Sequence, residues 1–433
     1  MGQSALCWKF IVNNWEEQRL IQKYTCKNGV RIVFEPIDTV RSVSIGVWVR
    51  VGSRNEHIKN NGISHFIEHM FFKGTKNRTA KEIAQAFDKI GGQVNAFTSK
   101  ECTCYYAKVM DTYAQTALDI LADMFFCSQF APKEMAKEKN VVLEEIKMYE
   151  DSPDDYVHDL LAQTIFGDHP LGYSILGREE NLQALTSEDL HQYVKKMYRP
   201  EEVVISVAGN VDAGFVHKIE ALFSTFEASD TREDMLAPPI FLPEKTVQRK
   251  DTEQAHLCLG FPGIPLNHPD MYGLIVLNNI LGGTMSSRLF QNVREEKGLA
   301  YAIYSYHTSY QSNGSVTIYG GTAVNQLNEL YETILMTLKE LQRDSVTDEE
   351  IKNTKEQLKG SLMLSLESTN SRMSRNGKNE LLMNKQMTLD EVVTRIDAVD
   401  RQMINRMIEF VFGAPHAIAL ISSEGKLPVS YAV

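Results

Sequence analysis

The sequence predicts an α+β protein with two domains of similar architecture, each a mainly antiparallel sheet packed against helices on one side. Its 433 residues correspond to two or three domains. The stretch from Ala228 to Thr246 is acidic and then Pro-rich, as linkers often are. The same order of strands and helices recurs on both sides of it. We therefore expect a tail at residues 1–20, domains at residues 21–227 and 247–433, and a linker at residues 228–246.

The composition is that of a soluble globular protein, with 43% hydrophobic and 23% charged residues. A formal net charge of −11 argues against general nucleic-acid binding, which usually requires a basic surface. It allows an acidic cavity that attracts cationic peptides. Six cysteines in this length are too few for a disulfide scaffold, so we expect reduced thiols.

The first residues show no membrane or secretion signal. The apolar run from Ala5 to Val12 is broken by Lys9 and is too short to span a bilayer. No small-residue cleavage site follows, and Leu6 occupies the position where a myristoylation signal needs Ser or Thr. We expect a cytoplasmic, bacterial-type protein with a poorly ordered tail and no membrane partner.

Strands and helices in the first half follow from periodicity. Val30 to Glu35 forms a strand after a turn, and Ser42 to Val51 alternates like a half-buried strand. Thr79 to Ile90 forms an amphipathic helix with Thr79 as N-cap, and Gln93 to Met110 forms two strands with a turn near Ser99. The rest is expected as helices at 113–126, 133–150, 154–166 and 187–197, then a strand at 203–208. Cys102 and Cys104 alternate on one strand face and are expected to be small buried side chains.

The second half repeats this order. The strand His256 to Phe261 corresponds to Ser42 to Val51, and the apolar helix Tyr272 to Leu281 corresponds to Ile63 to Phe72. The segment 297–302 echoes 92–97, and the helix 348–365 parallels 133–150. Since the second half lacks the metal-type motif described next, we expect one metal site per chain.

The motif His65-Phe66-Ile67-Glu68-His69 lies in the helix from Ile63 to Phe72. Its apolar residues recur with the helical period, so the side chains of His65, Glu68 and His69 share the opposite stripe. Two imidazoles one turn apart can hold a cation beside a carboxylate that accepts a proton from water. The order is the H-x-x-E-H of the inverzincins. A pattern this short also arises by chance, so a third ligand is required.

A catalytic zinc site has three protein ligands and leaves a position for water. The helix at 133–150 offers Glu138 and Glu145, which are seven residues apart and nearly on one face. Glu144 is rotated by about 100° from Glu145. Charged helix residues are mostly solvated, so the spacing by itself does not choose among these glutamates.

The segment from His65 to Thr75 resembles the signature of the pitrilysin/insulinase zinc peptidases, particularly the processing-peptidase beta subunit and its bacterial relatives. The resemblance covers nearly the whole chain. It implies that Glu145, 76 residues after His69, is the third ligand, so that His65, His69 and Glu145 hold one Zn²⁺. It further implies that Glu68 is the general base and that Glu138 supports the site.

The resemblance also assigns substrate contacts. Arg294 and Tyr301 match a pair that the family places opposite the zinc from its second domain, with Tyr301 as oxyanion donor and Arg294 as an anchor for the substrate backbone. Closing of the two domains is expected to bring the pair to the metal. Without the resemblance they would be a surface arginine and a core tyrosine. The family binds peptide by strand addition at an edge strand that matches Asn95, Ala96, Phe97 and Thr98. Cys102 stands where the family more often has His.

The family architecture implies that the two domains form half of a clam-shell chamber. A homodimer is then the leading expectation, with a companion-subunit heterodimer as the alternative. The leading functional hypothesis is a zinc endopeptidase that cleaves extended or unfolded peptides in the manner of a processing peptidase. The alternatives are a noncatalytic peptide-binding or scaffold subunit of the same fold, and a metal site that serves another hydrolysis.

Overall fold

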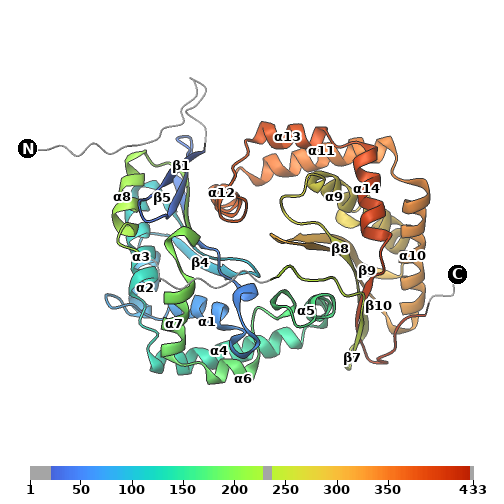
Figure 1. Cartoon of the computed structure of the whole chain (residues 1–433), viewed down its shortest axis with the longest axis horizontal. Helices are drawn as coiled ribbons and strands as arrows, with labels where there is room; N and C mark the ends of the chain where they lie inside the picture. The colour runs from blue at the N-terminus through green and yellow to red at the C-terminus, as the bar shows by residue number, and fades with distance from the viewer. Residues whose placement is uncertain (1–20, 228–236, 430–433) are drawn as a thin grey trace, which may run out of the picture.

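The computed structural model describes residues 21–227 and 237–429, which fold into two halves, each built on one sheet (Figure 1). The first half contains a six-stranded sheet of order β1-β2-β6-β3-β5-β4. Its neighbouring strands are antiparallel except for the β2/β6 pair. The strands are β1 (Gln22–Thr25), β2 (Arg31–Pro36), β3 (Ser42–Val49), β4 (Gln93–Thr98), β5 (Thr103–Met110) and β6 (Val203–Gly209).

Helices of the first half connect and cover these strands. Thr79 caps its helix as predicted, because its side chain accepts the N–H of Glu82 and Glu82 returns the contact. The α-helices are α1 (Ile63–Phe71), α2 (Ala80–Lys89), α3 (Ala114–Cys127), α4 (Pro132–Glu150), α5 (Pro153–Phe166), α6 (Glu179–Ala184), α7 (Ser187–Met197) and α8 (Gly214–Phe223). Short 3₁₀ turns are η2 (Ser53–Asn55), η3 (Ile58–Asn60), η4 (Asp111–Tyr113), η5 (Pro170–Gly172) and η6 (Pro200–Glu202).

The second half has a five-stranded sheet of order β7-β11-β8-β10-β9, in which only the β7/β11 pair is parallel. Its order and its one parallel pair match β2-β6-β3-β5-β4, so the predicted repetition holds at the level of topology. The strands are β7 (Lys245–Arg249), β8 (Gln254–Gly263), β9 (Ala300–Ser309), β10 (Gly314–Ala323) and β11 (Ala417–Ser422). The helices are α9 (Met271–Asn278), η7 (Asn279–Gly283), η8 (Phe290–Glu296), η9 (Val324–Gln326), α10 (Leu327–Asp344), α11 (Asp348–Ser365), α12 (Thr369–Met383), α13 (Leu389–Asp397) and α14 (Arg401–Phe412).

Strand β3 differs from its prediction as a half-buried strand, because both of its faces are covered. Val43, Ile45 and Val47 join the core of the first half, as the alternation predicts. The opposite face, with Trp48, packs against α12 of the second half. Trp48 Nε1 lies 3.4 Å from Met373 Sδ. A Cβ atom at Gly377 would lie 2.3 Å from Trp48 Nε1, so the helix approaches this closely only because residue 377 is glycine.

The second sheet receives a helix from the first half in return. Helix α5 packs on β8 and β11, and Figure 1 shows α12 beside the first sheet and α5 beside the second. A Cβ atom at Gly260 would lie 2.6 Å from Ile165 Cδ1, which marks another close approach. The central strands of each sheet are therefore covered on both faces, one layer more than the predicted helices on one side. The exchanged helices join the two halves.

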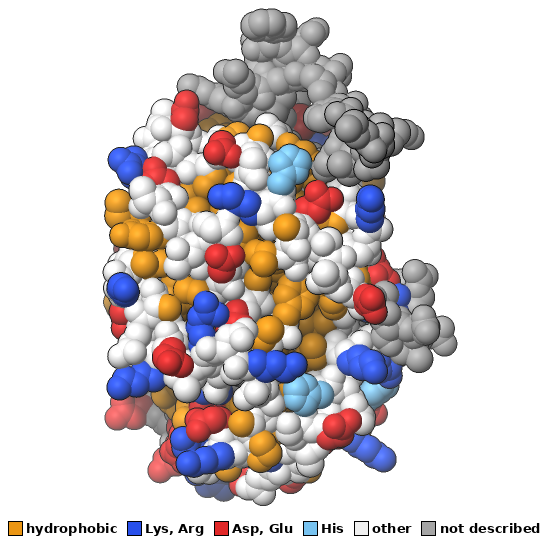
Figure 2. Space-filling view, turned by 90° about the vertical axis from the view of Figure 1, so that its left-hand side faces the viewer, with side chains coloured by type: hydrophobic (Ala, Val, Ile, Leu, Met, Phe, Trp, Pro, Cys, Tyr) orange, Lys and Arg blue, Asp and Glu red, His pale blue; other side chains and the backbone are white. Residues whose placement is uncertain are grey.

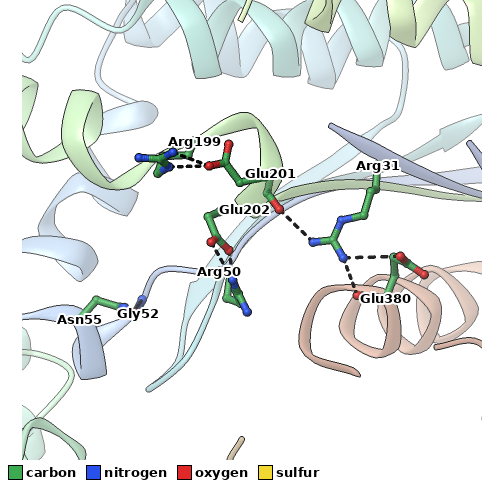
Figure 3. Close-up of polar contacts among 8 residues, drawn as sticks. All are labelled: Arg31, Arg50, Gly52, Asn55, Arg199, Glu201, Glu202 and Glu380. Carbon is green, nitrogen blue, oxygen red and sulfur yellow. Dashed lines mark hydrogen bonds and ion pairs between the residues drawn. The ribbon is translucent and has the colours of Figure 1, made fainter. Parts of the chain in front are cut away.

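Polar contacts also cross between the halves at β2 (Figure 3). Arg31 donates to the main-chain oxygen of Glu380 on α12 at 3.0 Å. Within its own half, Arg31 also donates to the main-chain oxygen of Glu201 at 3.2 Å. The Glu380 side chain is fully buried, and its carboxylate pairs with Lys23 at 2.7 Å. A buried carboxylate costs stability unless cations and hydrogen bonds compensate it, and here they come from the opposite half.

The predicted linker at residues 228–246 lies only partly within the described residues. Residues 228–236 of the predicted linker and the predicted tail at residues 1–20 lie outside the described residues. β7 starts at Lys245, so the last two residues of the predicted linker already belong to a strand. No helix in the described part of the chain is long and apolar enough to cross a membrane. Figure 2 shows acidic and basic side chains interspersed among hydrophobic ones on one face of the first half.

Candidate metal centre

Helix α1 presents the two histidines, and a buried carboxylate fixes its start. The N-cap is Gly62 with φ of +99°, which has no side chain to cap the helix. Glu56 supplies the cap instead, since its two oxygens accept the N–H groups of Gly62 and Ser64, each at 2.8 Å. Asn61 Nδ2 donates to the same carboxylate at 2.8 Å. Burial raises the pKa of Glu56 to about 7.

The predicted amphipathic pattern of α1 is confirmed. Ile63, Phe66, Ile67, Met70 and Phe71 are all buried in the core of the first half. The opposite stripe faces α4, which packs against α1. The core thus fixes the rotation of α1 and directs the side chains of its other stripe to a common point.

His65, His69 and Glu145 come together at that point. Nε2 of His65 lies 3.9 Å from Oε1 of Glu145, and Nε2 of His69 lies 3.6 Å from Oε2. The three ligand atoms lie within 4.8 Å of one another. Ligands about 2.0–2.1 Å from a tetrahedral Zn²⁺ are separated by roughly 3.3–3.4 Å, so this donor set fits zinc after small side-chain adjustments.

The two histidines have different electrostatic surroundings. Burial and the neighbouring His69 ring lower the pKa of His65 to about 3, so His65 is neutral and has a lone pair for a metal. Burial also lowers the pKa of His69, but the hydrogen bond to Glu138 and the charges of Glu145, Glu138 and Glu68 outweigh it and raise this pKa overall. The same carboxylates would also stabilise a metal cation bound at His69.

Glu138 orients His69 from behind. Its Oε1 lies 2.8 Å from His69 Nδ1, and its Oε2 lies 2.7 Å from Lys73 Nζ. Burial opposes the charge of Glu138, but the hydrogen bonds from His69 and Lys73 outweigh it and lower its pKa. Glu138 is thus an anion that accepts the Nδ1 proton and leaves Nε2 free for a metal.

Glu68 lies on the same stripe and is held by the sheet. Thr98, the last residue of β4, donates its hydroxyl proton to Oε2 of Glu68 at 2.5 Å. Burial raises the pKa of Glu68, while this hydrogen bond and the charge of His69 work in the opposite direction. A carboxylate with a raised pKa and one oxygen held in place suits a general base.

Strand β4 is an edge strand of the first sheet, paired with β5 among the described strands. Asn95, Ala96, Phe97 and Thr98, the predicted peptide-binding residues, all lie on it. Phe97 is 38% exposed and packs edge-on against Trp48 with ring centroids 5.5 Å apart. Thr98, at the end of this edge strand, thus connects the predicted peptide-binding residues to Glu68.

Arg294 and Tyr301 contact each other in the second half. The Arg294 guanidinium lies 4.5 Å from the Tyr301 ring centroid and donates to the Tyr301 carbonyl at 2.9 Å. Ala302 pairs with Gly321 and Ala300 with Thr322, so Tyr301 is the extra residue of a β-bulge. The bulge turns Tyr301 outward, where it is 79% exposed, unlike the core tyrosine considered as the alternative.

The structure does not join this pair to the metal triad within one chain. In the described ranges, no hydrogen bond, ion pair or ring contact links Arg294 or Tyr301 to His65, His69 or Glu145. Figure 1 shows α1 and α4 in one half and β9 in the other.

Comparisons with known proteins identify the family of this chain. Residues 31–179 match the family described as Insulinase (Peptidase family M16), and residues 184–358 match the Peptidase M16 inactive domain. The uncharacterized zinc protease YmxG of Bacillus subtilis is 59% identical over 94% of this chain and 100% of its own length. An uncharacterized zinc protease of Streptomyces coelicolor is 39% identical over 93% of this chain and 89% of its own length.

The chain belongs to the insulinase family of peptidases, family M16. Solved structures agree on the fold: a protease from Helicobacter pylori superposes with a TM-score of 0.88 at 23% identity, covering 93% of this chain and 99% of the other. The M16 inactive domain from Pseudomonas fluorescens gives 0.87 at 19% identity, covering 94% and 99%.

Three contacts of this M16 chain were not predicted from its sequence. Glu56 caps α1, Lys73 pairs with Glu138, and Thr98 binds Glu68 rather than serving only as a strand residue. Lys73 is four residues after His69, so helical spacing could have suggested it. Glu56 and Thr98 contact α1 from outside the helix, and the periodicity of a sequence does not predict such contacts.

Proposed function

We propose that this chain is a zinc endopeptidase that hydrolyses peptide bonds in extended or unfolded peptides, in the manner of a processing peptidase. The observation that carries the proposal is the joint arrangement of His65, His69 and Glu145 beside Glu68. Three ligands and an adjacent carboxylate make up a catalytic zinc site, whereas a structural site usually closes with a fourth protein ligand.

The residues around the triad would have separate roles in the hydrolysis. Bound zinc would supply a water of lowered pKa and polarise the substrate carbonyl. Thr98 holds Oε2 of Glu68, so Oε1 is the oxygen that takes the proton of the attacking water and returns it to the leaving nitrogen. Glu138 keeps the Nδ1 proton of His69 in place throughout.

An extended substrate follows from the edge strand. A peptide that pairs with β4 gains main-chain hydrogen bonds whatever its sequence, provided that it can straighten. Such pairing would carry the peptide along residues 95–98 towards Glu68. Folded proteins present few unpaired extended segments, so unfolded peptides are the preferred class.

Arg294 and Tyr301 would act through a dimer. Their exposure and their separation from the metal triad of their own chain suit a surface that a second chain meets. In a homodimer of two half-shells, the Tyr301 hydroxyl of one chain would stabilise the oxyanion at the metal centre of its partner. A companion-subunit heterodimer is the alternative assembly.

A noncatalytic peptide-binding subunit is the competing function. It would have no use for Glu68, which is half-buried, held by Thr98 and placed beside the ligands. Metal analysis combined with cleavage of a quenched fluorescent peptide, with and without a chelator, separates the two. We expect one zinc per chain and chelator-sensitive cleavage, and zinc without cleavage would support the competing function.

A further inference from the structure

A buried ion pair lies where two hairpin turns from different halves meet. Glu101 is in the turn between β4 and β5, and its carboxylate contacts the guanidinium of Arg54 in η2. Both carboxylate oxygens also accept the main-chain N–H of Gln311, each at 3.1 Å. Arg54 donates to the Ser312 hydroxyl at 2.7 Å. Gln311 and Ser312 belong to the turn between β9 and β10.

The pair is enclosed, so its contacts are strong and costly to break. The side chains of Arg54 and Glu101 are 11% and 8% exposed. A charge-assisted contact of this kind is stronger than one between neutral groups, and removing one partner leaves the other charge buried and uncompensated. The β9–β10 turn is therefore attached to the first half by both side chains.

Both residues are close in sequence to groups that hold the metal centre. Glu101 comes three residues after Thr98, whose hydroxyl binds Glu68. Arg54 comes two residues before Glu56, which caps α1. Their segments are also joined through the main chain, since the N–H of Arg54 donates to the oxygen of Lys100 at 2.8 Å.

We propose that Glu101 and Arg54 are positioning residues that use the β9–β10 turn of the second half as an anchor for β4. The anchored turn holds the peptide-pairing edge of β4 in place and keeps the Thr98 hydroxyl on Glu68. This proposal rests on the proposed function for its kinetic consequences, but the anchoring itself is independent of catalysis. Neither residue touches the metal triad, so zinc binding should survive its loss.

The effect expected on loss of the anchor has two parts. A mobile β4 presents its edge to peptide less often, which raises KM. A displaced Thr98 releases Oε2 of Glu68, which lowers kcat, since misplacement of a catalytic group by about 1 Å can cost 10²-fold. An ion pair that served stability alone would change neither constant in the folded enzyme.

Glu101→Gln is the decisive variant, because it keeps the size of the side chain but removes the charge that Arg54 needs. Ser312→Ala is a milder change from the other half, and it removes one hydrogen bond. Asp111→Asn is the matched control, since Asp111 binds Arg41 at 2.7 Å at the other end of β5, within the first half. Zinc content, kcat, KM and hydrogen exchange of the β4 amides are measured for each.

For Glu101→Gln we expect full zinc content, faster exchange in residues 93–98 and a fall in kcat/KM of roughly tenfold or more. Ser312→Ala should show smaller changes in exchange and in kcat/KM. Asp111→Asn should change neither quantity. In a Thr98→Val background, Glu101→Gln should no longer lower kcat, because both act on Glu68. Unchanged exchange in β4, or a decrease in kcat that is the same in both backgrounds, overturns the proposal. If the wild-type enzyme cleaves no peptide, the exchange measurement still decides whether the anchor exists.

Discussion

Oε1 of Glu138 lies 2.8 Å from Nδ1 of His69, and this contact determines which nitrogen of His69 faces the metal centre. The Nδ1 proton is held by an anion that Lys73 also stabilises. The lone pair on Nε2 is thereby directed towards Glu145.

Replacing Glu138 with Gln should therefore weaken zinc binding without abolishing it. Loss of a carboxylate partner behind a histidine ligand typically costs about 10–100-fold in metal affinity. Competition with a fluorescent chelator measures the change. Glu134→Gln is the matched control on the same helix, since Glu134 pairs with Lys137 instead. Equal zinc affinities for the two variants would contradict the orienting role.

Glu56 should make stability depend on pH. Its pKa rises from 4.5 to about 7 on folding, so between these values the native state holds a proton that the unfolded state releases. Its contribution to the free energy of unfolding is then largest below pH 4.5 and falls as pH rises towards 7, by roughly 3 kcal/mol in all.

Urea unfolding of the metal-free protein at pH 5 and pH 8 tests this, with Glu56→Gln as the reference. Groups other than Glu56 cancel in the difference between the two proteins. We expect the wild type to lose stability relative to Glu56→Gln over this range. A difference that stays constant with pH would refute the raised pKa.

Tyr301→Phe should reduce turnover with little effect on folding. Removal of one oxyanion donor typically lowers kcat by about 10²–10³-fold. Tyr301 is 79% exposed, so the thermal midpoint should stay within a degree or two, as expected for exposed positions. Tyr113→Phe, at another exposed tyrosine, is the control. An unchanged kcat would remove Tyr301 from the mechanism.

Gly377→Ala should loosen α12 from the first sheet. The new Cβ would lie 2.3 Å from Trp48 Nε1, and overpacking of this kind costs about 1–3 kcal/mol. Gly360→Ala is the matched control on α11, where a Cβ meets nothing within 4 Å. There alanine should stabilise the helix by up to about 1 kcal/mol. Denaturant unfolding that gave both variants the same sign would contradict the close packing of α12.

Local periodicity accounts for what the sequence could predict. The spacing of Ile63, Phe66 and Ile67 predicts the helix and its buried face, and thereby the common direction of His65 and His69. The seven-residue spacing of Glu138 and Glu145 predicts a shared helix face, but the resemblance was needed to choose Glu145. Repetition of the element order predicts the matching topology of the two sheets.

Contacts between distant segments account for what could not be predicted. Alternation along β3 predicts that the face with Trp48 is open to solvent. In the structure α12 covers that face, and no feature of the β3 sequence predicts this contact. Glu56, Thr98 and Glu101 act through partners that tertiary structure brings to them. The bulge that exposes Tyr301 depends on pairing between β9 and β10, so its outward orientation was not visible in the sequence.

The most direct test of the central claim is the zinc content and peptide turnover of Glu68→Gln. Glu68 shares the stripe of α1 with the two histidines but is not a member of the ligand triad. We predict one zinc per chain, as in the wild type, and loss of cleavage of a quenched fluorescent peptide. Normal cleavage by this variant would contradict the assignment of Glu68 as the base in a zinc peptidase.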